Sequence, residues 1–134
     1  MSATISQEFR ASSYYRGMAG SDRCLFCRIA HGEIPAKKVY EDADVVAFND
    51  INPQAPTHVL VIPRRHIASL DDMSEADAAA VGTTLLRLAQ IARDLHLNSD
   101  GYRAVVNHGE AAGQTVFHIH FHLLGGRNFG WPPG

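Results

Sequence analysis

Three histidines at alternate positions, His118, His120 and His122, constrain this chain more than any other feature of its sequence. Side chains of a β-strand alternate between its two faces, so a strand over residues 118–124 would place the three imidazoles on one face. The apolar residues around them would bury against a core on the other face; these are Phe117, Ile119, Phe121 and Leu123. Histidine serves proton transfer, nucleophilic attack and metal binding near neutral pH. The spacing therefore predicts a working face, on which the histidines bind a metal or one of them is a nucleophile.

A glycine-rich segment, residues 107–115, leads directly into these histidines. Its glycines let backbone N–H groups approach a ligand closely, and such turns can bind anions. By itself the segment would indicate only a hairpin connection, in which Gln114 is a turn residue. Next to a row of histidines, it favours a phosphate site.

The rest of the chain predicts one α+β domain built on a five-stranded antiparallel sheet. Apolar residues recur at helical spacing from Ser74 to His96, and Ser74 with Asp77 resembles a capping pair, so one long helix is expected there. A short helix is expected at Cys24–His31. The expected strands lie at residues 39–40, 45–48, 58–62, 103–106 and 118–124. Residues 1–22 show no clear period and predict a flexible N-terminal extension before a domain at 23–134.

Composition narrows the class of protein. A length of 134 residues suits one domain, and a net charge of −2 gives no support for nucleic-acid binding. Neither a membrane-spanning apolar run nor a secretory signal is evident, so the expected location is the cytoplasm. The two cysteines, Cys24 and Cys27, form a Cys-x-x-Cys pair. In a reducing compartment, such a pair is more typical of a metal site or a redox motif than of a structural disulfide.

The segment His118-Ile119-His120-Phe121-His122-Leu123-Leu124 resembles the signature of the histidine-triad (HIT) family. Further stretches between about Cys24 and the C-terminus resemble the same family, among them Pro53-Gln54-Ala55-Pro56-Thr57-His58. Gly125-Gly126-Arg127 and Trp131-Pro132-Pro133-Gly134 resemble its Hint branch, the histidine-triad nucleotide-binding proteins. The resemblance implies a HIT-like fold and a homodimer formed by helix and strand pairing. It also implies that the C-terminal tail reaches the partner's site.

The resemblance implies an enzyme that hydrolyses nucleoside phosphoramidates and acyl-nucleotides, mainly purine ones, to nucleoside monophosphates. His120 would attack the α-phosphorus and form a nucleotidyl-imidazole intermediate. His122 and Thr115 would contact the phosphate and assist the leaving group, and His58 would hydrogen-bond the nucleophilic ring; Thr115 stands where the family more usually has Ser. Further nucleotide contacts are implied for Asp50 at the ribose, for Asn107 and Gly113 at the phosphate, and for Phe26, Ile29, Phe48 and Ile51 at the base.

A second site is expected from Cys24, Cys27, His66 and His118. Two thiolates and two imidazoles are a common tetrahedral ligand set for zinc. Several HIT proteins and the related uridylyltransferases carry such a site, so the resemblance implies a structural zinc that is remote from the chemistry. The protein ligands would fill all four positions, leaving none for a substrate.

Three other functions share part of this pattern. A dinucleoside polyphosphate hydrolase of the Fhit type would use the same motif, although the Gly-Gly-Arg and Trp-containing segments argue against it. A nucleotide-binding or scaffold protein with incidental turnover would have the same pocket. A catalytic zinc enzyme would need its three histidines to converge, whereas the first and last of the triad lie about 13 Å apart on a flat strand.

Overall fold

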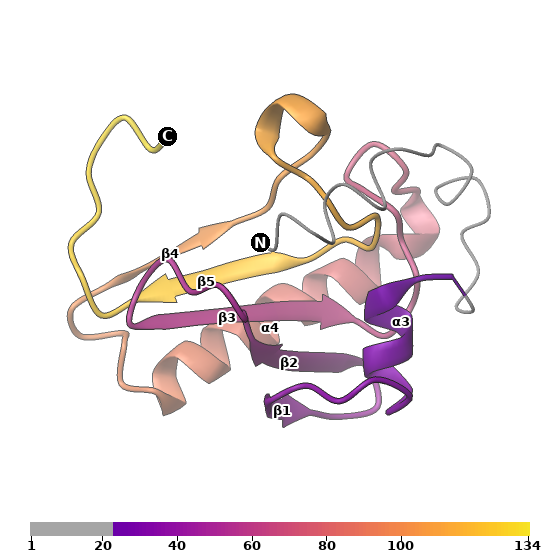
Figure 1. The fold of residues 1–134 in the computed structure, drawn as a ribbon, viewed down its shortest axis with the longest axis horizontal. Coiled ribbons are helices and arrows are strands. Elements are labelled where there is room, and N and C mark those ends of the chain that lie inside the picture. The colour runs from indigo at the N-terminus through magenta and orange to yellow at the C-terminus, as the bar shows by residue number, and fades with distance from the viewer. Residues whose placement is uncertain (1–22) are drawn as a thin grey trace.

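The computed structural model describes residues 23–134 (Figure 1). The extension predicted for residues 1–22 lies outside the described residues. In chain order the elements are α3 (Leu25–Ala30), β1 (Lys38–Glu41), β2 (Val45–Asn49), β3 (Thr57–Pro63), the 3-10 helix η1 (Glu75–Asp77), α4 (Ala78–Asp94), β4 (Tyr102–Val105), the 3-10 helix η2 (Glu110–Ala112) and β5 (Phe121–Gly125).

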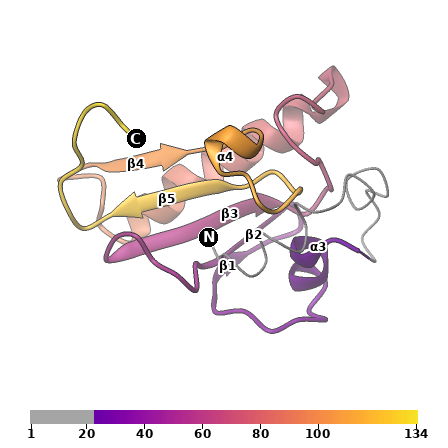
Figure 2. The ribbon, with the colours of Figure 1, turned by 45° about the horizontal axis from the view of Figure 1, so that its top comes forward.

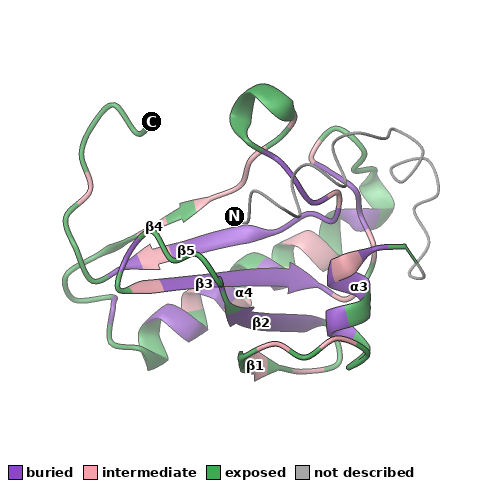
Figure 3. Ribbon diagram, in the orientation of Figure 1, coloured by how far each residue is buried: buried purple, intermediate pink, exposed green. Residues whose placement is uncertain are grey.

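The five strands form one antiparallel sheet in the order β1-β2-β3-β5-β4. This confirms the predicted α+β class, with one long and one short helix against five strands. The central strands β2, β3 and β5 are mostly buried, whereas the edge strands β1 and β4 are largely exposed (Figure 3). The described residues contain no helix long and apolar enough to cross a membrane.

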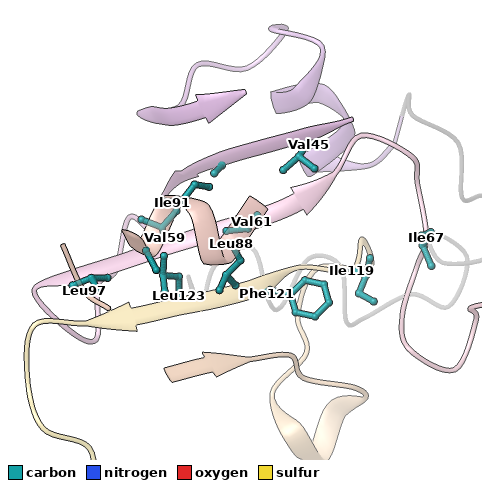
Figure 4. Packing of buried hydrophobic residues seen from close by; sticks show 12 residues of the cluster. Val45, Val59, Val61, Ile67, Leu88, Ile91, Leu97, Ile119, Phe121 and Leu123 are labelled. Atoms are coloured by element: carbon teal, nitrogen blue, oxygen red, sulfur yellow. The ribbon is translucent and has the colours of Figure 1, made fainter. Parts of the chain in front are cut away.

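The two helices cover opposite faces of the sheet (Figure 2). On one face, Leu88 and Ile91 of α4 pack against Val59, Val61 and neighbouring strand residues (Figure 4). On the other face, Phe26 and Ile29 of α3 pack against a second cluster that includes Phe48, Leu60 and Ile62. Because neighbouring strand residues alternate between these clusters, the pattern of the sequence decides which side chains α3 can reach.

The helix predicted from Ser74 begins as the 3-10 helix η1 and continues as α4 from Ala78, and the sheet covers only part of its apolar residues. The Ser74 N–H donates to Asp77 Oδ2 over 2.9 Å, which confirms the capping pair. Leu88 is buried with Ile91, as the helical spacing predicts. Leu85 is instead 44% exposed, and Leu86 and Leu95 are also exposed. The apolar arc of α4 is therefore wider than the part that the sheet covers.

The strand expected at residues 118–124 begins only at Phe121. Pairing with β3 runs from Thr57 opposite Gly125 to Val61 opposite Phe121. Continuing this register would place Ile119 opposite Pro63, which has no N–H to donate to the ladder. The Ile119 N–H instead donates to the Ile67 carbonyl, over 2.6 Å.

The side chains alternate between the two faces as predicted, although β5 begins only at Phe121. Ile119, Phe121 and Leu123 are buried in the α4 cluster, and Phe117 is half-buried. His118, His120 and His122 are all buried on the side of the sheet that faces α3. Two of the three histidines therefore stand on irregular backbone held by contacts outside the ladder.

Candidate functional site

A cavity of about 830 Å³ opens beside α3 and the ends of β2 and β3. This volume lies in the range of small-molecule sites. The four residues predicted to hold a base, Phe26, Ile29, Phe48 and Ile51, all line it. The rings of Phe26 and Phe48 meet edge to face, with centroids 5.3 Å apart. Ile51 is 79% exposed and lies at the mouth, so the cavity has an apolar floor and an open side.

A buried carboxylate lies in the cavity wall. Asp50 follows β2, and its backbone N–H donates to the His58 carbonyl over 3.0 Å. Its Oδ1 accepts a hydrogen bond from the Asn52 N–H over 2.8 Å, and its Oδ2 lies 3.4 Å from His58 Nε2. These contacts fix the orientation of the carboxylate that the sequence assigned to the ribose hydroxyls.

Hydrogen bonds define which nitrogen of each histidine carries the proton in the pair His58 and His122. The Gln54 backbone N–H donates to His58 Nδ1 over 3.0 Å, so the neutral His58 ring carries its hydrogen on Nε2. This Nε2–H lies 2.9 Å from His122 Nδ1 and donates to it. His122 therefore carries its own hydrogen on Nε2, a buried atom with no protein partner among the described residues. The pair presents one N–H donor in the interior of the site.

The nucleophile predicted at His120 has the opposite arrangement. Its Nδ1–H donates to the His118 carbonyl over 2.7 Å, so the lone pair is on Nε2. The ring centroid lies 5.1 Å from that of His122. The two neighbouring rings therefore carry a lone pair on Nε2 of His120 and an N–H on Nε2 of His122. The prediction that His58 bonds the nucleophilic ring is wrong, because the bond of His58 is to His122.

Burial keeps these rings neutral. It lowers the pKa of His120 to about 4 and, with the nearby charges of His120 and His58, the pKa of His122 to about 3. Burial also lowers the pKa of His58. A neutral imidazole is the nucleophilic form, so His120 meets the first requirement for attack on phosphorus at neutral pH.

The loop before the triad is positioned by its glycines. Gly109 and Gly113 flank η2 with φ of 84° and 87°, a region that favours glycine. The Gly113 N–H donates to the Glu110 carbonyl over 3.0 Å. The turn itself uses this N–H, and the contact of Gly113 with phosphate stays a prediction. Of the other predicted phosphate contacts, Thr115 is buried in the cavity wall and Asn107 is half-buried just after β4.

Gln114 holds this loop to the body of the protein, which the sequence alone did not indicate. Its side chain is 1% exposed, and its Nε2 donates to the carbonyls of Ala68 and Val116, over 2.9 and 3.3 Å. Its Oε1 accepts from the Gly109 N–H over 3.0 Å. Sequence reasoning also missed Ile34, Pro35 and Lys37 in the cavity wall, because no motif marks them.

The four residues of the second predicted site also lie together. The ligand atoms of Cys24, Cys27, His66 and His118 all lie within 4.8 Å of one another. The Cys24 Sγ is 3.3 Å from His118 Nδ1, and the Cys27 Sγ is 3.3 Å from His66 Nδ1. Ligands of a tetrahedral zinc ion would stand about 3.5 Å apart, sulfur to nitrogen. The donor set and its spacing fit zinc.

Two contacts prepare these groups as ligands. The His118 Nε2–H donates to the Pro63 carbonyl over 2.7 Å, so the lone pair on Nδ1 faces the sulfurs. The hydrogen bond from the Cys27 thiol lowers the pKa of Cys24, and the same bond raises the pKa of Cys27. The expectation that this site is remote from the chemistry is wrong, since His118 belongs to the cluster and its carbonyl holds His120.

His118 and His122 belong to different groups of potential metal ligands. Asp50, His58 and His122 form the other group, in which ligand atoms lie within 4.8 Å of one another. The hydrogen bond between His58 and His122 accounts for that approach. Within the described residues the three histidines of the motif therefore do not gather around one point, as the geometry of the strand predicted.

Comparisons with known proteins agree with this geometry. The model of the HIT domain family matches residues 31–129. An uncharacterised HIT-like protein of Synechocystis is 49% identical over 110 residues, covering 82% of this chain and 96% of that protein. The crystal structure of a HIT family hydrolase from Legionella pneumophila is 51% identical, with a TM-score of 0.81, over 83% of this chain and 99% of that chain. A zinc-bound histidine triad family protein from Mycobacterium smegmatis is 40% identical, with a TM-score of 0.68, over 86% and 82% of the two chains.

The lowered pKa values predict how stability depends on pH. Between pH 6.5 and about 4, the unfolded chain protonates its histidines while native His120 stays neutral. The free energy of unfolding should therefore decrease as the pH is lowered over this range, by about 1.4 kcal/mol per pH unit for each proton that only the unfolded chain binds. Denaturant unfolding at pH 7.0, 6.0 and 5.0 measures this slope.

The variant His120→Asn isolates the contribution of His120, because its side-chain amide can still donate to the His118 carbonyl but does not titrate. Its slope should be shallower than that of the wild type by up to one proton. Equal slopes would show that His120 binds its proton over the same pH range in the native and the unfolded state.

Proposed function

This chain belongs to the HIT domain family, and from that premise we propose that it is a nucleoside phosphoramidate hydrolase of the Hint branch. Its relatives include a HIT family hydrolase at 51% identity. The proposed substrates are nucleoside phosphoramidates and acyl-nucleotides, mainly of purines, and the product is the nucleoside monophosphate. One observation carries the proposal. A neutral His120 has its lone pair on Nε2, and the neighbouring His122 has its N–H on Nε2.

In the proposed first step, His120 Nε2 attacks the α-phosphorus and forms a P–N bond. The bond from phosphorus to the leaving amine or acyl oxygen breaks; an amine leaves with a proton taken from solvent, whereas an acyl group leaves as the carboxylate. The His122 Nε2–H stabilises the charge that develops on the phosphate oxygens. Water then attacks the phosphorus of the nucleotidyl-imidazole and releases a proton to solvent, the P–N bond breaks, His120 leaves as the neutral ring, and the nucleoside monophosphate departs.

The cavity residues supply binding in this proposal. Asp50 accepts hydrogen bonds from the ribose hydroxyls, since one carboxylate can accept from a vicinal diol. The base packs between the side chains of α3 and Ile51. Thr115 replaces the more usual Ser with a hydroxyl that can still contact the phosphate.

A direct test concerns His120. Replacing it by Asn should reduce hydrolysis of an adenosine phosphoramidate by roughly a thousandfold or more, because the nucleophile is lost. Binding of the monophosphate should change little, because Asp50 and the base pocket remain. Mass spectrometry of the quenched wild-type reaction should find a nucleotidyl adduct on His120.

The matched control is His108→Asn, which removes an exposed histidine from the same loop region. Its turnover should equal that of the wild type. An adduct on another histidine, or near-normal turnover of the His120 variant, would exclude the mechanism.

We also propose that Cys24, Cys27, His66 and His118 hold one structural zinc ion. The fit of the donor set supports this, as does the zinc-bound relative from Mycobacterium smegmatis. The metal would fasten α3 to the segments after β3 and before β5, so its contribution is to stability. A reducing compartment such as the cytoplasm would keep both thiols available as ligands.

Zinc analysis tests this proposal without reference to activity. Protein purified without chelator should contain about one zinc per chain. The double variant Cys24→Ser, Cys27→Ser should lose the metal and melt at a lower temperature, whereas His31→Ala, at an exposed histidine beside α3, should do neither. A metal-free wild type, or an unchanged melting temperature after the metal is removed, would refute the assignment.

A homodimer is the remaining part of the proposal. Strand β4 is an edge of the sheet, α4 exposes Leu85 and Leu86, and Leu95 directly after α4 is also exposed. A second copy could cover this apolar surface and extend the sheet through a twofold axis. Trp131 is 84% exposed and would then be available to the partner's site.

The dimer can be tested by placing a charge on the exposed face of α4. Light scattering at micromolar concentration should give twice the mass of the chain for the wild type. Leu86→Glu should shift this mass towards the monomer, because a buried unpaired charge is costly. Val39→Glu, at an exposed apolar position on β1, should leave the mass unchanged; a monomeric wild type would contradict the proposal.

A further inference from the structure

The proton arrangement of the two paired histidines begins at a backbone amide. His58 Nδ1 accepts from the Gln54 N–H, and this single contact places the hydrogen of His58 on Nε2. If His58 carried its hydrogen on Nδ1, that hydrogen would face the Gln54 N–H. His122 would then have to donate through Nδ1, and its Nε2 would present a lone pair to the phosphate. The position of Gln54 therefore determines whether the pair attracts or repels an anion.

Gln54 lies in an exposed segment between two prolines, outside the sheet. Its side chain makes only a local contact, from Nε2 to the Asn52 carbonyl over 3.0 Å. Its carbonyl, however, accepts a hydrogen bond from Arg127 Nε over 3.1 Å. Arg127 is 73 residues away in the sequence and is the second residue after β5. The peptide unit between Gln54 and Ala55, next to the one whose N–H bonds His58, is thus held from the far end of the histidine strand.

Arg127 is itself fixed by the segment that follows it. Its guanidinium lies over the ring of Phe129, 4.2 Å from the centroid, and its Nη1 donates to the Asn128 carbonyl over 3.0 Å. The ring also lies 5.1 Å from the guanidinium of Arg103 on β4, and Arg103 donates to the Gly130 carbonyl over 2.9 Å. Stacking on an aromatic face orders a side chain that would otherwise be mobile in solvent.

A close backbone contact supports the same arrangement. Gly126 has φ of 89°, and a Cβ at this position would lie 2.9 Å from Pro56 Cβ. The turn after β5 therefore packs directly against the segment that carries Gln54. Two adjacent residues, Gly126 and Arg127, thus lie against this segment, the first at Pro56 and the second at Gln54.

We propose that Arg127 is a positioning residue for the catalytic histidines. By holding the Gln54 carbonyl, it keeps the Gln54 N–H on His58 Nδ1 and so keeps the N–H of His122 directed at the phosphate. This inference rests on the proposed function and assigns it a residue that touches neither the substrate nor the histidines. It predicts that the segment after β5 acts on the site of its own chain.

The experiment uses the full-length protein and five variants. Arg127→Met removes the donor to Gln54, and Arg127→Lys keeps a cationic donor. Arg103→Met loosens the same Phe129 ring without contacting Gln54. Gln54→Pro removes the N–H that His58 accepts, and Gln54→Ala keeps it.

The first measurement is the nitrogen-15 NMR spectrum of the histidine rings, in which protonated and unprotonated nitrogens are resolved. His58 is identified by comparison with His58→Asn. The wild type, Gln54→Ala and Arg103→Met should show His58 protonated on Nε2. Arg127→Met and Gln54→Pro should show a mixture of the two ring forms, with Arg127→Lys closer to the wild type. If Gln54→Pro does not fold, the Arg127 variants decide.

The second measurement is turnover of an adenosine phosphoramidate. Arg127→Met should lower kcat roughly tenfold or more while KM and monophosphate binding stay within a few fold, since complete tautomer errors in other catalytic triads cost far more. Arg103→Met should change kcat little. An unchanged His58 ring form in Arg127→Met, or equal losses of kcat in both arginine variants, would overturn the inference. Absence of a His120 adduct in the wild type would instead refute the proposed function, because the ring spectrum does not depend on turnover.

Discussion

The two contacts of His118 join the halves of the functional region. Its ring faces the sulfurs of α3, and its carbonyl accepts the Nδ1–H of His120. Because β5 begins only at Phe121, no ladder hydrogen bond with β3 holds either residue. The metal-ligand cluster, the Pro63 carbonyl and the Ile67 carbonyl take the place of the ladder. A histidine that would otherwise lie on a loose segment thus keeps one orientation.

In the paired rings, burial determines the charge and hydrogen bonding determines the tautomer. Burial lowers the pKa of His58, His120 and His122, so all three rings are neutral at neutral pH. Neutrality alone does not define a site, because each neutral ring has two tautomers. Backbone groups at Gln54 and His118 make that choice, one as a donor and the other as an acceptor. The result is a lone pair and an N–H on neighbouring rings.

Much of this could be predicted from the sequence, because it follows from periodicity and motif. The five strands, the long helix with its Ser74 cap, and the convergence of Cys24 with His118 were all expected. Other features depend on backbone groups, which look alike in every sequence. The Gln54 N–H, the use of the Gly113 N–H within its own turn, and the partner of His58 are of this kind. The role of Gln114 was missed because a buried glutamine that makes tertiary hydrogen bonds cannot be told from an exposed turn glutamine in the sequence.

The alternation around the histidines has a further consequence for how this region can vary. Ile119, Phe121 and Leu123 bury against α4, while the histidines between them face α3. Inserting or deleting one residue between 118 and 123 would exchange the two sets, placing imidazoles in the apolar cluster and apolar groups at the phosphate. Substitutions affect one position at a time, but a change of length affects every position at once. The apolar residues of this segment can therefore be replaced by others of similar volume more readily than the segment can change its length.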